Sequence, residues 1–280
     1  MDFYAELQRI LDQVPSGSHT TVLELARAMG DLASAKAIRE SLLRPDFWKY
    51  VNKVNGGNHS FTSFQTDEPL LRLAEKQAEM AKLVVEEDVL GAWGRVAGVD
   101  AAYEGDRAYA VCVVVDWSGR VVSEGSAEVE VGFPYIPSYF YCREGPALVA
   151  AVRGIDFDVL MVNAHGVAHP RRLGLASQLG LGLGKSTVGV STGLLAGEVK
   201  GRSGVVSDIY LRDFKVGVRL DGKPSLIVSV GHMVSLGTAV SVVKTFWGGL
   251  GLPRPLELAH EAAHRLCSSR SWSYERTPTP

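Results

Sequence analysis

The sequence has little cysteine, little net charge and no long apolar run, and each shortage excludes a class of protein. The three cysteines, Cys112, Cys142 and Cys267, are odd in number and show no CxxC spacing, which argues against a disulfide framework and indicates a reducing compartment. A formal net charge of -2 gives no global basic field, so any nucleic-acid site must be a local patch. No apolar run reaches membrane-spanning length and the acidic N-terminus does not resemble a signal peptide, so we expect a cytoplasmic protein without a membrane partner.

The rest of the composition is that of a folded globular protein. Hydrophobic residues make up 46% of the chain, which excludes wholesale disorder and supplies a sizeable core. A length of 280 residues accommodates one large domain together with a small one. Shifts in pattern predict four parts: a helical domain over 1–55, a linker over 56–67, a main domain over 68–267 and a flexible tail over 268–280.

The first 55 residues have the pattern of short helices joined by tight turns. Apolar residues at helical spacing predict a first helix near the N-terminus. Thr21 and Glu24 form a capping box that opens a second helix, which Gly30 ends, and a third helix covers about 33–43. Such a series is typical of a helix-turn-helix module and equally of a small helical cap, and the pattern alone favours neither.

The main domain alternates strands and helices after a first amphipathic helix at about 70–88. We predict strands over 96–103, 109–116, 119–131, 158–163, 186–191 and 225–231, and helices over 144–152, 171–184 and 256–266. This alternation predicts an α/β fold in which helices flank a sheet.

Four polar side chains stand at the ends or rims of apolar segments in this domain. Asp100 interrupts VAGVDAAY, Glu144 follows an aromatic loop, Asn163 ends DVLMVN, and His232 follows SLIVSVG. A lone strand aspartate is more often a satisfied polar group, but four such residues at matching strand ends favour a site. Oxygen ligands there suit Mg²⁺ or Mn²⁺, which neutralises developing charge and activates water in phosphodiester hydrolysis.

Two further motifs imitate known sites. Gly184-Lys185-Ser186 resembles the end of a phosphate-binding loop, but Leu179 stands where that motif needs glycine, so we expect no nucleotide cofactor. His260, Glu261 and His264 match HExxH and leave a zinc peptidase as a distant alternative. A surface histidine pair on an alanine-rich helix is the simpler interpretation.

Residues from about 70 to 266 resemble endonuclease V, a deoxyinosine-directed repair nuclease with an RNase H-like fold. VAGVD matches the family's first-strand motif, FPYIPSYFYCREGPAL matches PYIPG…REGPAL, HGVAHPRRLGLASQLGL matches HPRRLGLASHLGL, and VGHMVSL matches GHRxSL. The resemblance implies an RNase H-like mixed sheet flanked by helices and metal-dependent phosphodiester hydrolysis 3′ to a deaminated base. It places Asp100, Glu144 and His232 in the site, the two acids as metal ligands.

The resemblance also implies how nucleic acid is bound. Tyr135, Ile136 and Pro137 would form a wedge inserted at the lesion, and a proline-flanked aromatic loop is suitably rigid and apolar. Glycine-rich backbone beside it can approach an extruded base closely. The implied binding residues around that base are His165, Gly166, His169, Pro170, Arg171, Leu173, Gly174 and Ser177.

The chain departs from the family's pattern at the hydrolytic site. Asn163 stands in place of a metal-binding aspartate, so it is at best a weak, uncharged ligand, and the affinity for Mg²⁺ or Mn²⁺ should fall. Thr192 stands in place of the site lysine, and Met233 in place of a common arginine. The loss of one anion and one cation is either a compensated exchange or the decay of an unused site.

The N-terminal segment carries a second, shorter resemblance. VPSGSHTTVLELARAMG and SAKAIRESLLRP resemble the DNA-binding domain of O6-alkylguanine-DNA alkyltransferases and alkyltransferase-like proteins. By that match Val51 replaces the reactive cysteine and Val22 a tyrosine, so alkyl transfer is excluded for want of the thiol. Lys36 replaces the arginine of the recognition helix and is expected to contact DNA. The segment is either a duplex reader or a relic packing domain.

Two leading hypotheses follow for the whole chain. The first is a monomeric endonuclease V-like DNA-repair protein that recognises deoxyinosine and cleaves with Mg²⁺ or Mn²⁺. The second is a protein that binds deaminated or damaged DNA, or RNA, without cutting it. The choice depends on Asn163 and Thr192, since losing one carboxylate from such a site costs about 4 kcal/mol or more of transition-state stabilisation.

Overall fold

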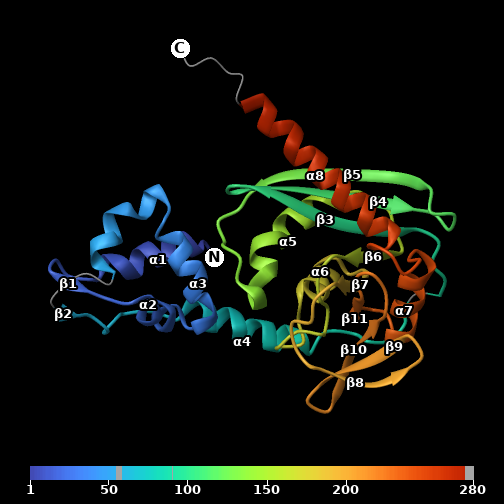
Figure 1. Ribbon diagram of the computed structural model, residues 1–280, viewed down its shortest axis with the longest axis horizontal. Coiled ribbons are helices and arrows are strands. Elements are labelled where there is room, and N and C mark those ends of the chain that lie inside the picture. The colour runs from blue at the N-terminus through green and yellow to red at the C-terminus, as the bar shows by residue number, and fades with distance from the viewer. Residues whose placement is uncertain (55–58, 90, 275–280) are drawn as a thin grey trace. The chain divides into compact units, whose positions relative to one another are not determined.

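The computed structural model describes residues 1–54, 59–89 and 91–274 and divides into two compact units (Figure 1). Unit 1 comprises Met1–Glu79 and Gly132–Arg143, and unit 2 comprises Met80–Val131 and Glu144–Pro280. Among the described residues, no helix has the length and apolar character needed to cross a membrane.

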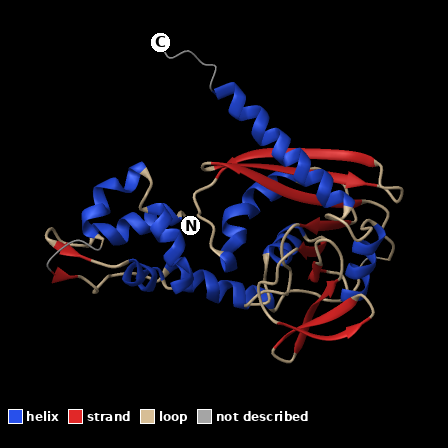
Figure 2. Cartoon of the chain, viewed as in Figure 1, coloured by secondary structure: helices blue, strands red, loops and turns tan. Residues whose placement is uncertain are grey.

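Unit 1 is mainly helical (Figure 2). Its elements are α1 (Phe3–Asp12), β1 (Ser18–His19), α2 (Val22–Met29), η1 (Leu32–Ser34), α3 (Ala35–Ser41), η2 (Pro45–Lys53), β2 (His59–Ser60), α4 (Pro69–Ala81) and η3 (Pro137–Tyr139). Thr21 caps α2 by accepting from the N–H of Glu24, and Gly30 ends that helix at φ +91°, as predicted. The Glu24 carboxylate pairs with Arg27 instead of reaching back, so only half of the predicted capping box forms.

The core of unit 1 is built from both of its chain segments. Helical side chains of the first segment pack with Phe133, Ile136 and Tyr139 of the second. The structure therefore draws the boundary differently from the predicted domain over 1–55 and linker over 56–67. Part of that linker forms β2, which pairs in parallel with β1, while Asn55–Asn58 lie outside the described residues. The boundary differs because the apolar side chains of the second segment need the cover that these helices give.

Unit 2 is a nine-stranded mixed sheet in the order β5-β4-β3-β6-β7-β11-β10-β9-β8, which confirms the predicted fold class. Its strands are β3 (Val96–Glu104), β4 (Arg107–Val115), β5 (Val121–Glu130), β6 (Val159–Val162), β7 (Ser186–Ser191), β8 (Glu198–Ser203), β9 (Val206–Leu211), β10 (Phe214–Leu220) and β11 (Leu226–His232). The β3–β6 and β6–β7 pairs are parallel, and the other neighbours are antiparallel.

Helices cover this sheet and complete its core. They are α5 (Phe140–Ala151), α6 (Leu175–Leu183), α7 (Leu236–Thr245) and α8 (Arg254–Tyr274). Helix α8 lies against β3 and β4 (Figure 1), whereas α6 contacts β7 and β11. The approach of α8 is very close, because a Cβ on Gly98 would lie 2.2 Å from the carbonyl atoms of Pro255. Helix α8 also continues to Tyr274, through residues predicted to be tail, and the last six residues lie outside the described chain.

Candidate functional site

The register of two parallel strands creates the centre of the site. Strands β3 and β6 pair up to Val99 and Val162, so Asp100 and Asn163, the next residues, emerge side by side at the carboxyl ends. Nδ2 of Asn163 donates a hydrogen bond to Oδ2 of Asp100 at 3.2 Å. The structure thus brings these two candidate site residues together.

His260 of α8 joins this pair. Its Nδ1 lies 2.7 Å from the same Oδ2 of Asp100, across 160 residues of sequence. The HExxH motif left a zinc peptidase only as a distant alternative for His260, and in the structure this ring nitrogen lies beside Asp100. Among the side chains that the structure describes, no group of three or more His, Cys, Asp or Glu is arranged to hold a metal ion. The sequence analysis therefore did not predict the contact of His260 with Asp100. The sequence feature that could have indicated it is a histidine next to Ala259, a residue of the buried face of the helix.

Glu144 is held by a different neighbour. Its side chain is buried, and Oε1 accepts a hydrogen bond from the hydroxyl of Tyr103 at 3.0 Å. Tyr103 lies three residues after Asp100 on β3, and strand alternation directs the two side chains to opposite faces of the sheet. Glu144 is thus anchored from the α5 side, whereas Asp100 is engaged from the α8 side.

His232 does not join the site, and the reason is strand direction. Strand β11 runs antiparallel to β7, and His232 pairs with Thr187 near the start of β7. His232 therefore lies at the end of the sheet where β7 begins, opposite the carboxyl ends of β3 and β6 that carry Asp100 and Asn163. There Nδ1 of His232 accepts from the backbone N–H of Val85 at 3.1 Å, which makes it a structural residue.

The segment after Asn163 is packed tightly by its glycines. Gly166 donates its N–H to Oγ of Ser229 at 2.9 Å, and Gly174 donates to the carbonyl of Gly166 at 2.9 Å. A Cβ on Gly166 would lie only 1.8 Å from the carbonyl oxygen of Val230. Only glycine permits such an approach, so the turn is fixed in one conformation.

His165 ties this turn to the loop after β7. Its Nε2 lies 2.9 Å from Oγ of Ser191 and 2.8 Å from the carbonyl oxygen of Gly193. Burial lowers the pKa of His165, which keeps the ring neutral, although the hydrogen bond to Gly193 acts in the opposite direction. Thr192 lies between these two partners and is exposed.

The remaining predicted base-contacting residues divide into buried and accessible ones. His169 is buried, and its Nδ1 accepts from the N–H of Arg171 at 3.2 Å. Leu173 and Ser177 are fully buried, so they support the segment and do not present side chains to a ligand. Pro170 is exposed and Arg171 half-buried, so these two can reach one.

The predicted wedge is only partly on the surface. Tyr135 is 57% exposed and Pro137 is exposed. Ile136 is 0% exposed and belongs to the core of unit 1, so it cannot enter a base stack as this structure stands. The prediction that three consecutive residues form the wedge is therefore wrong for Ile136.

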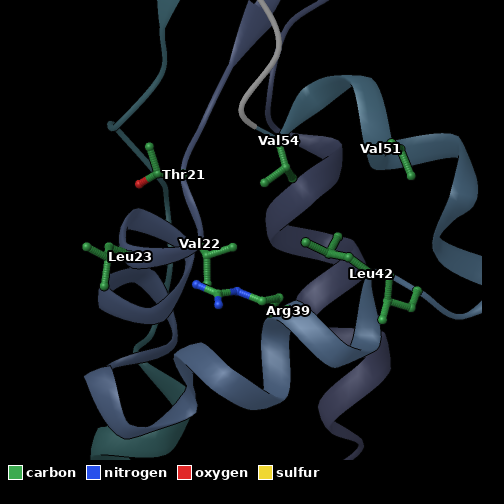
Figure 3. Close-up of a pocket in the computed structure, with 8 residues that line it drawn as sticks. Thr21, Val22, Leu23, Arg39, Leu42, Val51 and Val54 are labelled. Carbon is green, nitrogen blue, oxygen red and sulfur yellow. The ribbon is translucent and has the colours of Figure 1, made fainter.

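Unit 1 contains a cavity of about 450 Å³ that is lined by residues in and around α2, α3 and η2. Figure 3 shows Arg39 extending from α3 toward Val22 of α2. The lining residues are Thr21, Val22, Leu23, Arg39, Leu42, Leu43, Val51 and Val54. The positions aligned with the reactive cysteine and a tyrosine of alkyltransferases, Val51 and Val22, thus share one apolar pocket. Lys36 projects from α3 into solvent beside Glu40, at 3.7 Å.

The oxygen ligands predicted for Mg²⁺ do not fit a preformed cation site. Oδ2 of Asp100 faces two hydrogen-bonding nitrogens, those of Asn163 and His260. Oε1 of Glu144 accepts from the hydroxyl of Tyr103. At position 163 the amide presents an N–H group to Asp100. An aspartate at this position would instead add a second negative charge, which a bound cation would have to balance.

Comparisons with known proteins agree with this architecture. The endonuclease V family model matches residues 78–261. Endonuclease V of Pyrococcus abyssi is 37% identical over 191 residues, 68% of this chain and 89% of that protein. A protein of Picrophilus torridus named bifunctional methyltransferase/endonuclease is 26% identical and covers 93% of this chain and 95% of its own. The crystal structure of endonuclease V from Streptomyces avermitilis has a TM-score of 0.65 and 31% identity, covering 71% of this chain and 94% of that one. With its mixed sheet, its Asp100 at the end of β3 and a match over most of its length, the chain belongs to the endonuclease V family.

Proposed function

We propose that this protein recognises a deaminated base, deoxyinosine in DNA in the first place, and that its phosphodiester hydrolysis is strongly attenuated. The observation that carries the proposal is the hydrogen bond from Asn163 to Asp100, beside a base-pocket segment that keeps the family's sequence. Membership of the endonuclease V family supports the choice of inosine.

The recognition half of the proposal rests on the segment from 164 to 174. Close packing of its glycines fixes the backbone of this segment. A fixed backbone can hydrogen-bond the edge of an extruded base without losing further conformational entropy on binding. Inosine pairs weakly in a duplex, so extrusion costs less at that base than at a normal one, which supplies part of the selectivity.

The attenuated half rests on charge. Endonuclease V enzymes are metal-dependent nucleases, and a bound divalent cation there supplies charge neutralisation and an activated water. In this chain Asn163 and His260 already form hydrogen bonds with the Asp100 carboxylate, so the affinity of this carboxylate for a cation is reduced. Thr192, exposed where the family pattern has lysine, also removes a positive charge that could stabilise the transition state.

Unit 1 is proposed to be an alkyltransferase-like reader of duplex DNA without transferase activity. Its support is the helix-turn-helix of α2 and α3, the pocket that joins Val22 and Val51, and the relative whose name couples a methyltransferase to an endonuclease over 93% of this chain. Lys36 and Arg39 are cations exposed on α3 and would contact phosphates.

The central experiment measures binding and cleavage of matched oligonucleotides. Single- and double-stranded DNA, and RNA, with one inosine or none are incubated with the wild type, Asn163→Asp, Asn163→Asp/Thr192→Lys and Asp100→Ala, in Mg²⁺ and in Mn²⁺. We expect inosine-preferring binding by the wild type, slow cleavage at most, and faster cleavage by the double variant. Rapid wild-type cleavage that Asp100→Ala abolishes would refute the attenuation, and equal binding of both oligonucleotides would refute the recognition.

A separate experiment tests unit 1 as a DNA reader. The affinity for undamaged duplex is measured over a range of salt for Lys36→Ala and Arg39→Ala, with Arg153→Ala on unit 2 as the matched surface control. A variant that no longer binds one phosphate should show a slope of log affinity against log salt that is lower by about 1. An unchanged slope in both α3 variants would show that this helix does not bind the duplex.

A further inference from the structure

The loop that precedes α5 is built into the hydrophobic core of unit 1. Phe133, Ile136 and Tyr139 are at most 1% exposed and pack with the helices near the N-terminus. Rings of Phe3 and Phe133 meet edge to face at 5.5 Å. Three large side chains in one short loop bury enough apolar surface to fix its path over the helices.

Hydrogen bonds fix the same loop at both ends. At its start, the N–H of Phe3 donates to the carbonyl of Gly132 at 3.1 Å. At its end, the hydroxyl of Tyr139 lies 2.6 Å from Oδ2 of Asp31 and 3.1 Å from the carbonyl oxygen of Leu70. Beside it, Nε2 of Gln77 donates to the carbonyl of Ser138 at 3.2 Å. Both ends of the loop are therefore held by partners that precede residue 80.

The side chain left outside is that of Tyr135. It is 57% exposed, although the residue after it is fully buried, and its ring meets that of Phe140 edge to face at 5.5 Å. A rigid loop with one projecting aromatic ring is the arrangement that inserts into or stacks on bases at low entropic cost.

We propose that unit 1 serves as the rigid support of the base-probing loop, with Asp31 and Tyr139 as positioning residues and Tyr135 as the aromatic side chain presented to the lesion. This inference rests on the proposed recognition of a deaminated base. It assigns unit 1 a second task besides duplex binding, namely to hold the loop that probes the lesion.

Asp31 connects the helices of unit 1 to the loop. Asp31 lies in the turn between α2 and α3 and caps η1 by accepting from the N–H of Ala33. The turn of the helix-turn-helix therefore contacts the loop directly through Tyr139. Helix α5 begins at Phe140, immediately after Tyr139, and carries Glu144 in its second turn.

The test compares two tyrosines buried in the same core. Tyr139→Phe removes the hydroxyl that contacts Asp31, whereas Tyr50→Phe removes an equivalent bond to Asp12, at 2.7 Å, away from the loop. We expect Tyr139→Phe, like Asp31→Asn, to lower the preference for inosine over matched duplex about tenfold, the usual effect of one hydrogen bond to a charged group. Tyr50→Phe should leave that preference within about twofold of the wild type, and Tyr135→Ala should abolish it.

Hydrogen exchange of residues 132–143 gives a readout that needs no nucleic acid. Tyr139→Phe and Asp31→Asn should speed exchange in this segment, and Tyr50→Phe should not. Equal losses of inosine preference, or equal exchange, in Tyr139→Phe and Tyr50→Phe would overturn the proposal in favour of a general stability effect. If the wild type shows no inosine preference, recognition itself fails, and unchanged exchange in Tyr139→Phe would overturn the support separately.

Discussion

Replacing Asn163 by aspartate tests whether the amide has taken the place of a cation. In the wild type Nδ2 of Asn163 donates to Oδ2 of Asp100 at 3.2 Å, so the buried carboxylate is satisfied without a metal. The substitution Asn163→Asp puts a second carboxylate at that distance and removes the donor. Two unit charges about 3 Å apart repel by about 5 kcal/mol at an effective dielectric constant of about 20.

The protein has less costly responses, which set an upper limit. Protonating one carboxyl at pH 7 costs about 4 kcal/mol, because an ordinary aspartate titrates about 3 units lower. The imidazole of His260, 2.7 Å from Asp100, can also take up a proton and offset part of the repulsion. We therefore expect the metal-free variant to be less stable than the wild type at pH 7, by at most about 4 kcal/mol. Because the repulsion favours proton uptake by the folded variant, stability is recovered as pH falls, by up to about 1.4 kcal/mol per unit down to about pH 4.

The assay is urea unfolding of both proteins as a function of pH, with and without Mg²⁺. Magnesium should stabilise the variant, by about 2.7 kcal/mol at a hundredfold excess over its dissociation constant, and should leave the wild type nearly unchanged. Asparagine and aspartate have nearly the same shape, so the variant should fold as the wild type does. Circular dichroism at low pH serves as the control for folding. A destabilisation below about 1 kcal/mol that does not vary with pH, or equal stabilisation of both proteins by Mg²⁺, would refute the reasoning.

Three other predictions follow from packing and burial. Gly98→Ala should lower the free energy of urea unfolding by about 2–3 kcal/mol, because the added Cβ would lie 2.2 Å from backbone atoms of α8; Gly91→Ala, which meets open space, is the control, and equal costs would contradict the close approach. Burial raises the pKa of Cys112 to about 12, so this thiol should react with a disulfide reagent only after unfolding, and rapid reaction of the native protein would contradict its burial. Burial lowers the pKa of His165 and of His232, so the unfolded chain takes up these protons first as pH falls below about 6.5. Stability measured by urea unfolding should then decrease between pH 7 and 5, less steeply in His232→Gln, and an unchanged slope in that variant would contradict the assignment.

The centre of the site could be predicted from sequence because a local rule determines it. Asp100 and Asn163 each follow a buried strand, and parallel neighbours bring their carboxyl ends together. His232 also follows a buried strand, but its location depends on the direction of β11. That direction depends on β8, β9 and β10, short strands that the sequence analysis did not predict, as it did not predict α7.

Contacts between distant segments account for the other differences. His260 reaches Asp100 only because α8 rests directly on Gly98, and no pattern near His260 carries that information. Ile136 lies in a proline-flanked loop of the kind that usually stays on the surface. Its burial depends on apolar cover from helices that precede residue 80, which a local reading of the loop does not reveal.

The two-segment construction of unit 1 has a consequence for how the gene can be divided. A fragment that ends before Met80 would lose Phe133, Ile136 and Tyr139 from its core, and a fragment that begins there would carry those side chains uncovered. No single break in the chain yields two complete domains.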